Sequence, residues 1–202
     1  MSCAENSSGD GAEIVSTEVK HRGWSTFLLA TIRLPDGTTI SRAIEDHGNA
    51  VAVLPYDPER RTAILVQQFR APALYGAKQN HVLEAVAGRI DDGEDPESCA
   101  RREAVEEAGL KLNALDRVAR AWAMPGVSTE QMDLFLGEYG EADRVGAGGG
   151  VAGEHENIEV IELPLSRLAA MADAGDLHDM KLLLLVQTLR LRRPELFGRL
   201  TA

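Results

Sequence analysis

The sequence has little of what a disulfide-rich, membrane-spanning or nucleic-acid-binding protein needs. It has two cysteines, Cys3 in a polar tail and Cys99 in a helical pattern, so no disulfide framework is indicated. Its 21 basic residues are outnumbered by 32 acidic ones, and the net charge of -11 excludes a general basic surface for DNA or RNA. The most apolar run, "LLLLV" at residues 182–186, is too short to span a bilayer.

The start of the chain lacks the features of a targeting signal. "MSCAENSSGDGAE" has no basic start and no apolar stretch, so it is not a secretory signal. Residues 1–12 are polar and rich in Gly and Ser, which predicts a disordered tail. We therefore expect a soluble, cytoplasmic protein that binds neither nucleic acid nor membranes.

The remaining sequence mixes strand and helix patterns within 202 residues, enough for one large domain with a small extra lobe. Strands are predicted at residues 25–34, 38–46, 49–56, 62–69, 81–88, 116–124, 132–139 and 158–164. Helices are predicted at residues 95–109, 165–175 and 179–193, and a Gly-rich loop at 140–157. The mixture and its local hairpins favour an α+β fold with a mixed sheet over a doubly wound parallel sheet. Residues 13–45 are expected to form a small antiparallel sheet, packed on its own chain or on a partner.

Acidic residues are concentrated in "GRIDDGEDPESCARREAVEEAGL", which places eight carboxylates within residues 88–110. The same stretch carries the signals of a helix. Asp95 can cap its start, Pro96 suits its first position, and Gly109 can end it. Like charge is therefore concentrated on a single helix.

On that helix each residue advances by about 100°, so Glu103, Glu106 and Glu107 share one face. Two carboxylates about 5 Å apart repel by about 3 kcal/mol at an effective dielectric near 20. A bound metal ion removes that cost, and hard oxygen ligands suit Mg²⁺ or Mn²⁺. Protein-bound Mg²⁺ usually takes some of its ligands from substrate phosphates. A phosphate ester or anhydride is therefore the expected substrate class. Taken alone, three glutamates on a helix are more often a solvated face.

The residues around this helix follow the pattern G-x5-E-x7-R-E-U-x-E-E-x-G-U, where U is apolar. The matching positions are Gly88, Glu94, Arg102, Glu103, Glu106, Glu107, Gly109 and Leu110, with a small Ala104 at the first apolar position. This string resembles the signature of the Nudix hydrolases. "VQQFRAP", "LEAVAGRID" and Pro125 resemble the ADP-ribose and nucleotide-sugar pyrophosphatase branch, and "AGGGVAGEHENIEVIELP" is similar to its GDP-mannose pyrophosphatases.

The resemblance implies a fold, an activity and an assembly. The fold would be an α/β/α sandwich with a mixed sheet, as a Nudix domain over residues 46–198. The activity would be hydrolysis of nucleoside diphosphate sugars, ADP-ribose or GDP-mannose, with about two or three Mg²⁺ or Mn²⁺ ions. Products would be a nucleoside monophosphate and a sugar phosphate. The assembly would be a homodimer that exchanges the sheet at residues 13–45.

Roles for single residues also follow from the resemblance. Glu103 and Glu107 would be the principal metal ligands, joined by Glu106 and the backbone carbonyl of Ala87. Arg102 would hold the glutamates by a salt bridge, and Glu94 would tie the loop to the helix. The catalytic base would come from the distant loop "GEHEN", where Glu154 ranks ahead of Glu156.

Four further residues are candidates for substrate binding, and each has a plain structural alternative. Arg70 would bind a phosphate or the terminal sugar, or else be a solvated strand-end arginine. Glu84 would contact ribose or metal, or else point outward from a strand. Arg42 would reach the site from the exchanged sheet, or else form a surface cross-strand pair. Glu130 would shape the pocket rim, or else belong to a capped turn.

Two other functions stay open at this point. The chain could be a Nudix enzyme acting on nucleoside triphosphates, although Pro125 and the long acidic loop argue against it. It could also be a non-catalytic sensor of nucleotide sugars, although such proteins usually lose the carboxylates that are all present here.

Overall fold

The computed structural model describes residues 11–150 and 157–198. In it the chain forms two compact units. The first contains residues 11–49 and 122–131, and the second contains the remaining described residues. The acidic stretch at residues 88–110 lies in the second unit, which therefore carries the candidate site.

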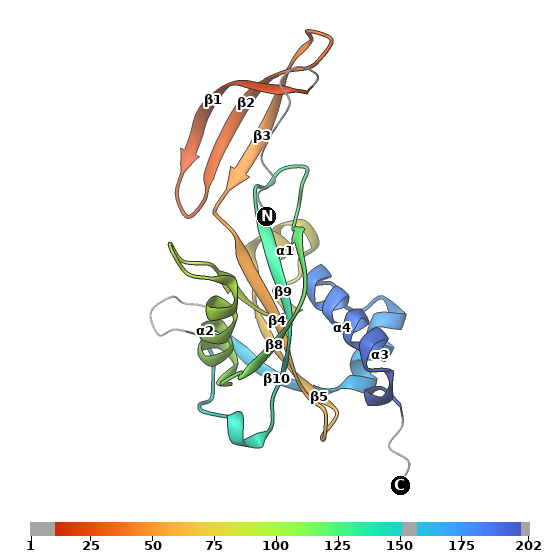
Figure 1. The fold of residues 1–202 in the computed structure, drawn as a ribbon. Helices are drawn as coiled ribbons and strands as arrows, with labels where there is room; N and C mark the ends of the chain where they lie inside the picture. Colours follow the sequence, from red (N-terminus) through yellow and green to blue (C-terminus); the bar gives the residue numbers. More distant parts are fainter. Residues whose placement is uncertain (1–10, 151–156, 199–202) are drawn as a thin grey trace, which may run out of the picture. The chain divides into compact units, whose positions relative to one another are not determined.

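The first unit is built on a three-stranded antiparallel sheet with the order β1-β2-β3 (Figure 1). Its strands are β1 (Glu13–Arg22), β2 (Thr26–Arg33) and β3 (Thr39–Asp46). The turn between β2 and β3 contains Gly37 at a φ of 83°, and Asp36 accepts a hydrogen bond of 2.8 Å from the Thr38 N–H. The Pro-Asp-Gly turn and the small antiparallel sheet predicted from the sequence are therefore confirmed.

The second unit is built on a seven-stranded sheet. The strands are β4 (Ala50–Asp57), β5 (Thr62–Phe69), β6 (His81–Glu84), β7 (Val86–Arg89), β8 (Ala114–Trp122), β9 (Gln131–Glu138) and β10 (Glu159–Pro164). Their order is β10-β5-β4-β9-β8, with β6 beside β5 and β7 beside β4. β4 runs parallel to β9 and antiparallel to β5 and β7, so the predicted mixed sheet is confirmed.

Helices cover both faces of this sheet (Figure 1). They are α1 (Ala71–Ala77), α2 (Pro96–Ala108), α3 (Leu165–Ala174) and α4 (Met180–Arg192). α2 lies on one face, and α3 and α4 lie on the other. None of the helices within residues 11–150 and 157–198 has the length and apolar character needed to cross a membrane.

The buried core has two parts because β4 presents alternate side chains to the two faces. Ala52 and Leu54 pack in the cluster that includes α3 and α4, whereas Val51 and Val53 pack in the cluster under α2. The α2 contribution consists of small side chains, namely Cys99, Ala100, Ala104 and Ala108. Small side chains allow α2 to lie close to the sheet, which places its glutamates near the backbone of β7.

The predicted and observed elements differ at residues 81–88, and strand β1 and helix α1 were not among the predicted strands and helices. The single strand predicted at residues 81–88 is divided into β6 and β7, because these pair with different strands, β5 and β4. Helix α1 was not predicted. It is seven residues long, contains no buried residue, and has too little apolar periodicity to be recognised.

Gly137 of β9 provides a test of the packing under α2. A Cβ atom at this position would lie 2.7 Å from Leu112 Cδ1 and 3.3 Å from Val53 Cγ2. We expect Gly137→Ala to lower the free energy of unfolding by about 1–3 kcal/mol through overpacking. Gly76→Ala in α1 is the control, since its Cβ would meet nothing within 4 Å. Urea unfolding measures both, and equal stabilities for the two variants would contradict this packing.

Candidate active site

Helix α2 begins and ends where its capping residues predict. The side chain of Asp95 accepts hydrogen bonds of 3.1 Å from the N–H groups of Glu97 and Ser98, and Pro96 is the first helical residue. Gly109 ends the helix at a φ of 66°. The helix is therefore held at both ends by local interactions, which fixes the direction of the side chains between them.

The glutamates of α2 reach β7 from the helix face that meets the sheet. Glu107 is only 3% exposed, and its Oε2 accepts a hydrogen bond of 3.0 Å from the Ala87 N–H. The Glu103 carboxyl lies over Gly88, where a Cβ atom would be 1.8 Å from Glu103 Oε1. Gly88 is thus required because any larger residue would displace Glu103. Glu106, on the same helix, is half-buried.

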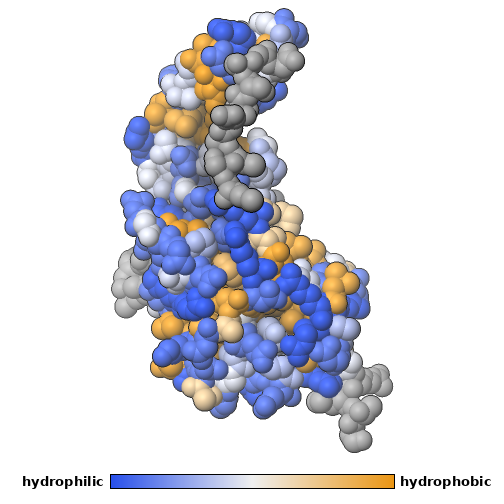
Figure 2. Space-filling model, viewed as in Figure 1, coloured by the Kyte–Doolittle hydropathy of each residue, from blue (hydrophilic) through white to orange (hydrophobic). Residues whose placement is uncertain are grey.

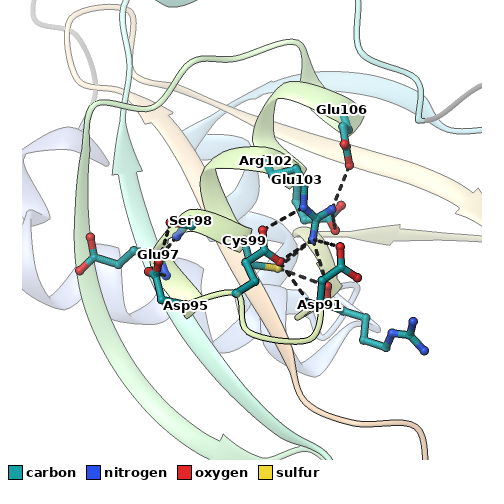
Figure 3. A network of polar contacts seen from close by, with 10 residues as sticks. Asp91, Asp95, Glu97, Ser98, Cys99, Arg102, Glu103 and Glu106 are labelled. Carbon is teal, nitrogen blue, oxygen red and sulfur yellow. Dashed lines mark hydrogen bonds and ion pairs between the residues drawn. The ribbon is translucent and has the colours of Figure 1, made fainter.

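Arg102 is the hub of the contacts around these carboxylates (Figure 3). It donates to both oxygens of Glu94, at 3.0 and 2.9 Å, and to Arg89 O at 3.1 Å. Its Nη1 donates to Glu103 at 2.7 Å and to Glu106 at 3.0 Å. One guanidinium therefore joins the loop before α2 to two glutamates on the helix. These are the contacts implied for Arg102 and Glu94, while their parts in catalysis stay predictions.

The contacts of Arg102 also favour the charged forms of Arg102 and Glu94. Its hydrogen bond to Glu94 raises the pKa of Arg102 above the ordinary value, and the charge and hydrogen bond of Glu103 act in the same direction. The same hydrogen bond lowers the pKa of Glu94. Both groups are thus held in their charged forms near neutral pH, which keeps the loop fastened to α2.

A second carboxylate cluster lies at the end of β6, around Glu84. Glu84 is only 4% exposed, so the predicted alternative that it points outward from a strand is wrong. It accepts from Arg70 at 2.6 and 3.1 Å and from Lys181 Nζ at 2.6 Å. Burial raises the pKa of Glu84, but the hydrogen bond from Arg70 and the charge of Lys181 outweigh burial and lower it overall. Arg70 remains nearly half exposed and can still meet a ligand.

Asp179 links the cluster around Glu84 to the start of the segment that contains β7, against which the glutamates of α2 lie. It caps α4 and receives Lys181 Nζ at 3.0 Å. It also accepts a hydrogen bond of 3.2 Å from the Ala85 N–H. Ala85 lies between β6, which pairs with β5, and β7, which pairs with β4. Ala87, two residues later, donates to Glu107. The sequence gave no signal for the bond from Asp179 to Ala85.

Arg42 and Glu130 belong to the first unit. Arg42 of β3 is paired with Ala30 of β2, and its Nη1 donates to Ser41 O at 2.9 Å. Glu130 lies 3.3 Å from His47 Nε2, and His47 also contacts Glu45 at 2.8 Å. A role for Arg42 or Glu130 in substrate binding stays a prediction. Glu154 and Glu156, the predicted bases, lie outside the described residues.

The donor set at α2 and β7 fits a hard divalent cation in its chemistry. Glu103, Glu106, Glu107 and the Ala87 carbonyl supply oxygen atoms only, as Mg²⁺ and Mn²⁺ prefer. In the part of the chain that the structure describes, no three such side chains converge in a geometry that could hold an ion. Oxygens of Glu103 and Glu106 are directed to Arg102, so metal binding would require these side chains to turn.

Glu84 gives a prediction about stability and pH. Because its pKa is lowered in the folded protein, its contribution to stability is present above the ordinary value of about 4.5 and is lost as the pH falls through the lowered pKa. We expect acidification from neutral pH to reduce the unfolding free energy of the wild type more than that of Glu84→Gln. Urea unfolding across this range measures the difference, with the exposed Glu97→Gln as control. Parallel pH profiles for wild type and Glu84→Gln would refute the pairing.

Comparison with known proteins places this geometry in a family. The NUDIX domain profile matches residues 46–178. A GDP-mannose pyrophosphatase of Cronobacter sakazakii is 42% identical over 160 residues, covering 78% of this chain and 82% of the relative. A GDP-mannose pyrophosphatase of Citrobacter koseri is 39% identical over 149 residues, covering 73% and 76%.

A solved structure agrees in fold. It is described as an ADP compounds hydrolase and has a TM-score of 0.74 and 17% sequence identity, covering 94% of this chain and 98% of the other. At that identity the likeness concerns the fold alone. The domain match and the close relatives carry the assignment, and the chain belongs to the Nudix hydrolase family.

Proposed function

We propose that this enzyme hydrolyses the pyrophosphate bond of nucleoside diphosphate sugars, with GDP-mannose as the first substrate to test. The proposal draws on the relatives of 39–42% identity that are described as GDP-mannose pyrophosphatases. The structural observation that supports it most directly is the position of Glu103 and Glu107 against the backbone of β7. GDP-mannose is favoured over ADP-ribose because the ADP compounds hydrolase shares only 17% identity.

Glu103, Glu107, Glu106 and the Ala87 carbonyl are the residues that would hold Mg²⁺ or Mn²⁺. When bound, such cations would neutralise phosphate oxygens and acidify a water nucleophile. The Ala87 N–H fixes the Glu107 carboxylate, and Gly88 leaves room for Glu103 beside it. Arg102 would orient Glu103 and Glu106 and limit their mutual repulsion.

The remaining groups would bind substrate or transfer the proton. Arg70, held by Glu84, would place its exposed guanidinium on a phosphate or on the terminal sugar. Glu154, or in second place Glu156, would accept the proton of the attacking water. Attack on one phosphorus would then release GMP and mannose 1-phosphate. Arg42 and Glu130 would also contact the substrate.

We also propose a homodimer that uses the small sheet. Several large apolar side chains on this sheet are exposed, and Figure 2 shows hydrophobic surface over it. They are Ile14, Val15, Val19, Phe27 and Leu29. Large exposed apolar side chains gathered on one small sheet commonly mark an interface. A partner subunit on this sheet would remove that surface from water.

The metal assignment is tested with Glu107→Gln. We expect this variant to lower kcat for GDP-mannose by roughly a hundredfold or more at saturating Mg²⁺, because a charged ligand is lost. Chromatography and mass spectrometry of GMP and mannose 1-phosphate provide the measurement. Glu97→Gln is the matched control, since Glu97 lies exposed on the same helix and pairs with Arg101.

Three results would count against parts of the proposal. Unchanged kcat in Glu107→Gln would contradict the metal assignment. Faster release of pyrophosphate from GTP than of GMP from GDP-mannose would favour a triphosphate pyrophosphatase. A wild-type protein that hydrolyses neither GDP-mannose nor ADP-ribose with Mg²⁺ or Mn²⁺ would favour a non-catalytic sensor.

The dimer is tested with Leu29→Arg. A charge at this exposed position of β2 should oppose burial of the sheet against a partner, so we expect the molecular mass in light scattering to fall to that of a monomer. Leu29→Met keeps the apolar surface and should remain dimeric. A monomeric wild type, or a dimeric Leu29→Arg protein, would exclude this interface.

A further inference from the structure

Four charged side chains from three separate segments meet where β6 gives way to β7. Arg70 follows β5, Glu84 ends β6, and Asp179 and Lys181 lie at the start of α4. The side chains of Glu84, Asp179 and Lys181 are 6%, 10% and 15% exposed, whereas that of Arg70 is 44% exposed. Arg70 is therefore the member of this cluster that a ligand can most readily reach, and the other three support it from below.

Lys181 shares the carboxylate of Glu84 with Arg70. Glu84 Oε1 accepts from Arg70 Nε at 2.6 Å, and Oε2 accepts from Arg70 Nη2 at 3.1 Å and from Lys181 Nζ at 2.6 Å. Lys181 thus makes the shorter bond to Oε2 and brings a second positive charge to a single carboxylate. The bonds to Glu84 use two of the five N–H groups of the Arg70 guanidinium. Because Lys181 helps to neutralise Glu84, the charge of Arg70 stays available to an anion.

Asp179 holds Lys181 in place and also binds the backbone that leads to the candidate metal ligands. Its Oδ1 accepts from Lys181 Nζ at 3.0 Å, and its Oδ2 accepts from the Ala85 N–H at 3.2 Å. Two residues later, the Ala87 N–H donates to Glu107 Oε2 at 3.0 Å. A short run of hydrogen bonds and peptide units therefore joins the start of α4 to the end of α2.

Arg70 is also within electrostatic reach of the α2 glutamates. Burial lowers the pKa of Arg70, but the hydrogen bond and charge of Glu84 outweigh burial, and the charges of Glu107 and Asp179 add to the rise. The guanidinium therefore remains charged and acts on Glu107 as well as on Glu84. A phosphate held beside Glu107 would lie close to the exposed part of Arg70, where a charge-assisted hydrogen bond can form.

We infer that Asp179 and Lys181 are positioning residues, which keep the guanidinium of Arg70 available for a substrate phosphate beside Glu107. The inference rests on the proposed function, in which Arg70 binds the substrate. Without the ammonium group of Lys181, the buried carboxylates of Glu84 and Asp179 draw the guanidinium and its charge inward. A network that served stability alone would leave the affinity for substrate unchanged when this charge is removed.

The enzymatic test compares Lys181→Met with Lys111→Met. Lys111 is an exposed lysine just after α2, so this control loses the same charge outside the Glu84 cluster. We expect Lys181→Met to raise KM for GDP-mannose roughly tenfold and to change kcat little, because a contact made in both the ground state and the transition state is weakened. Lys181→Arg keeps the charge and should restore a KM near that of the wild type. Equal KM values for Lys181→Met and Lys111→Met would overturn the inference while leaving the proposed function intact.

A double-mutant cycle separates positioning from a general loss of structure. In a Glu84→Gln background the carboxylate that captures Arg70 is gone, so adding Lys181→Met should raise KM by less than about twofold. The double variant removes both charges of a buried pair together, which costs less stability than removing one of them. If Lys181→Met does not fold, Lys181→Gln replaces it, since its amide still donates to Glu84 without a charge. An equal rise of KM in both backgrounds would overturn the inference.

Amide hydrogen exchange tests the backbone link without substrate or metal. Asp179→Ser keeps a capping oxygen for α4 but lacks the second oxygen that binds Ala85. We expect the Ala85 N–H to exchange roughly tenfold faster in Asp179→Ser than in the wild type, while the Leu182 N–H in the first turn of α4 stays protected. Equal exchange at Ala85 in the two proteins would overturn the role of Asp179. A wild type that protects Ala85 but hydrolyses no nucleotide sugar would instead count against the proposed function.

Discussion

Repulsion among carboxylates that are crowded against one strand is the constraint on which the rest of this structure depends. Glu103 and Glu107 are nearly buried, and Glu103 lies about one turn before both Glu106 and Glu107 on the helix. Arg102 compensates the cluster with a single delocalised charge that bonds Glu94, Glu103 and Glu106 at once. A lysine could not do this, because its ammonium group lacks the planar set of donors.

The same solution recurs at two other buried carboxylates of the second unit. Glu84 is paired with Arg70 and Lys181, and Asp133 on β9 is paired with Arg117 and has Arg120 at 3.8 Å. Burying an unpaired charge is costly, and cations from neighbouring elements reduce that cost at both of these groups. The ion pairs of Glu84 lie where β6 gives way to β7. The ion pairs of Asp133 join β9 to the edge strand β8.

Local signals in the sequence predicted the elements that local physics controls. Asp95, Pro96 and Gly109 delimited α2 because capping depends on residues within one turn. Runs of apolar residues identified β4, β5, β9 and β10, whose side chains fill two cores. The division of residues 81–88 into two strands escaped prediction, since it depends on which strands lie beside them. Glu84 looked the same from the sequence whether it pointed outward or inward.

The sequence by itself determined the acidic helix, its ends, the candidate metal-ligand residues and, through the spacing of those residues, the family. Only the tertiary structure decided that Asp179 bonds Ala85, 94 residues away, and that Gly149 and Gly150 bind the carbonyls of Glu107 and Glu106. The reason is physical. Caps and periodicities are set by neighbours within a few residues, whereas these bonds exist only after the sheet has brought distant backbone groups within hydrogen-bonding distance.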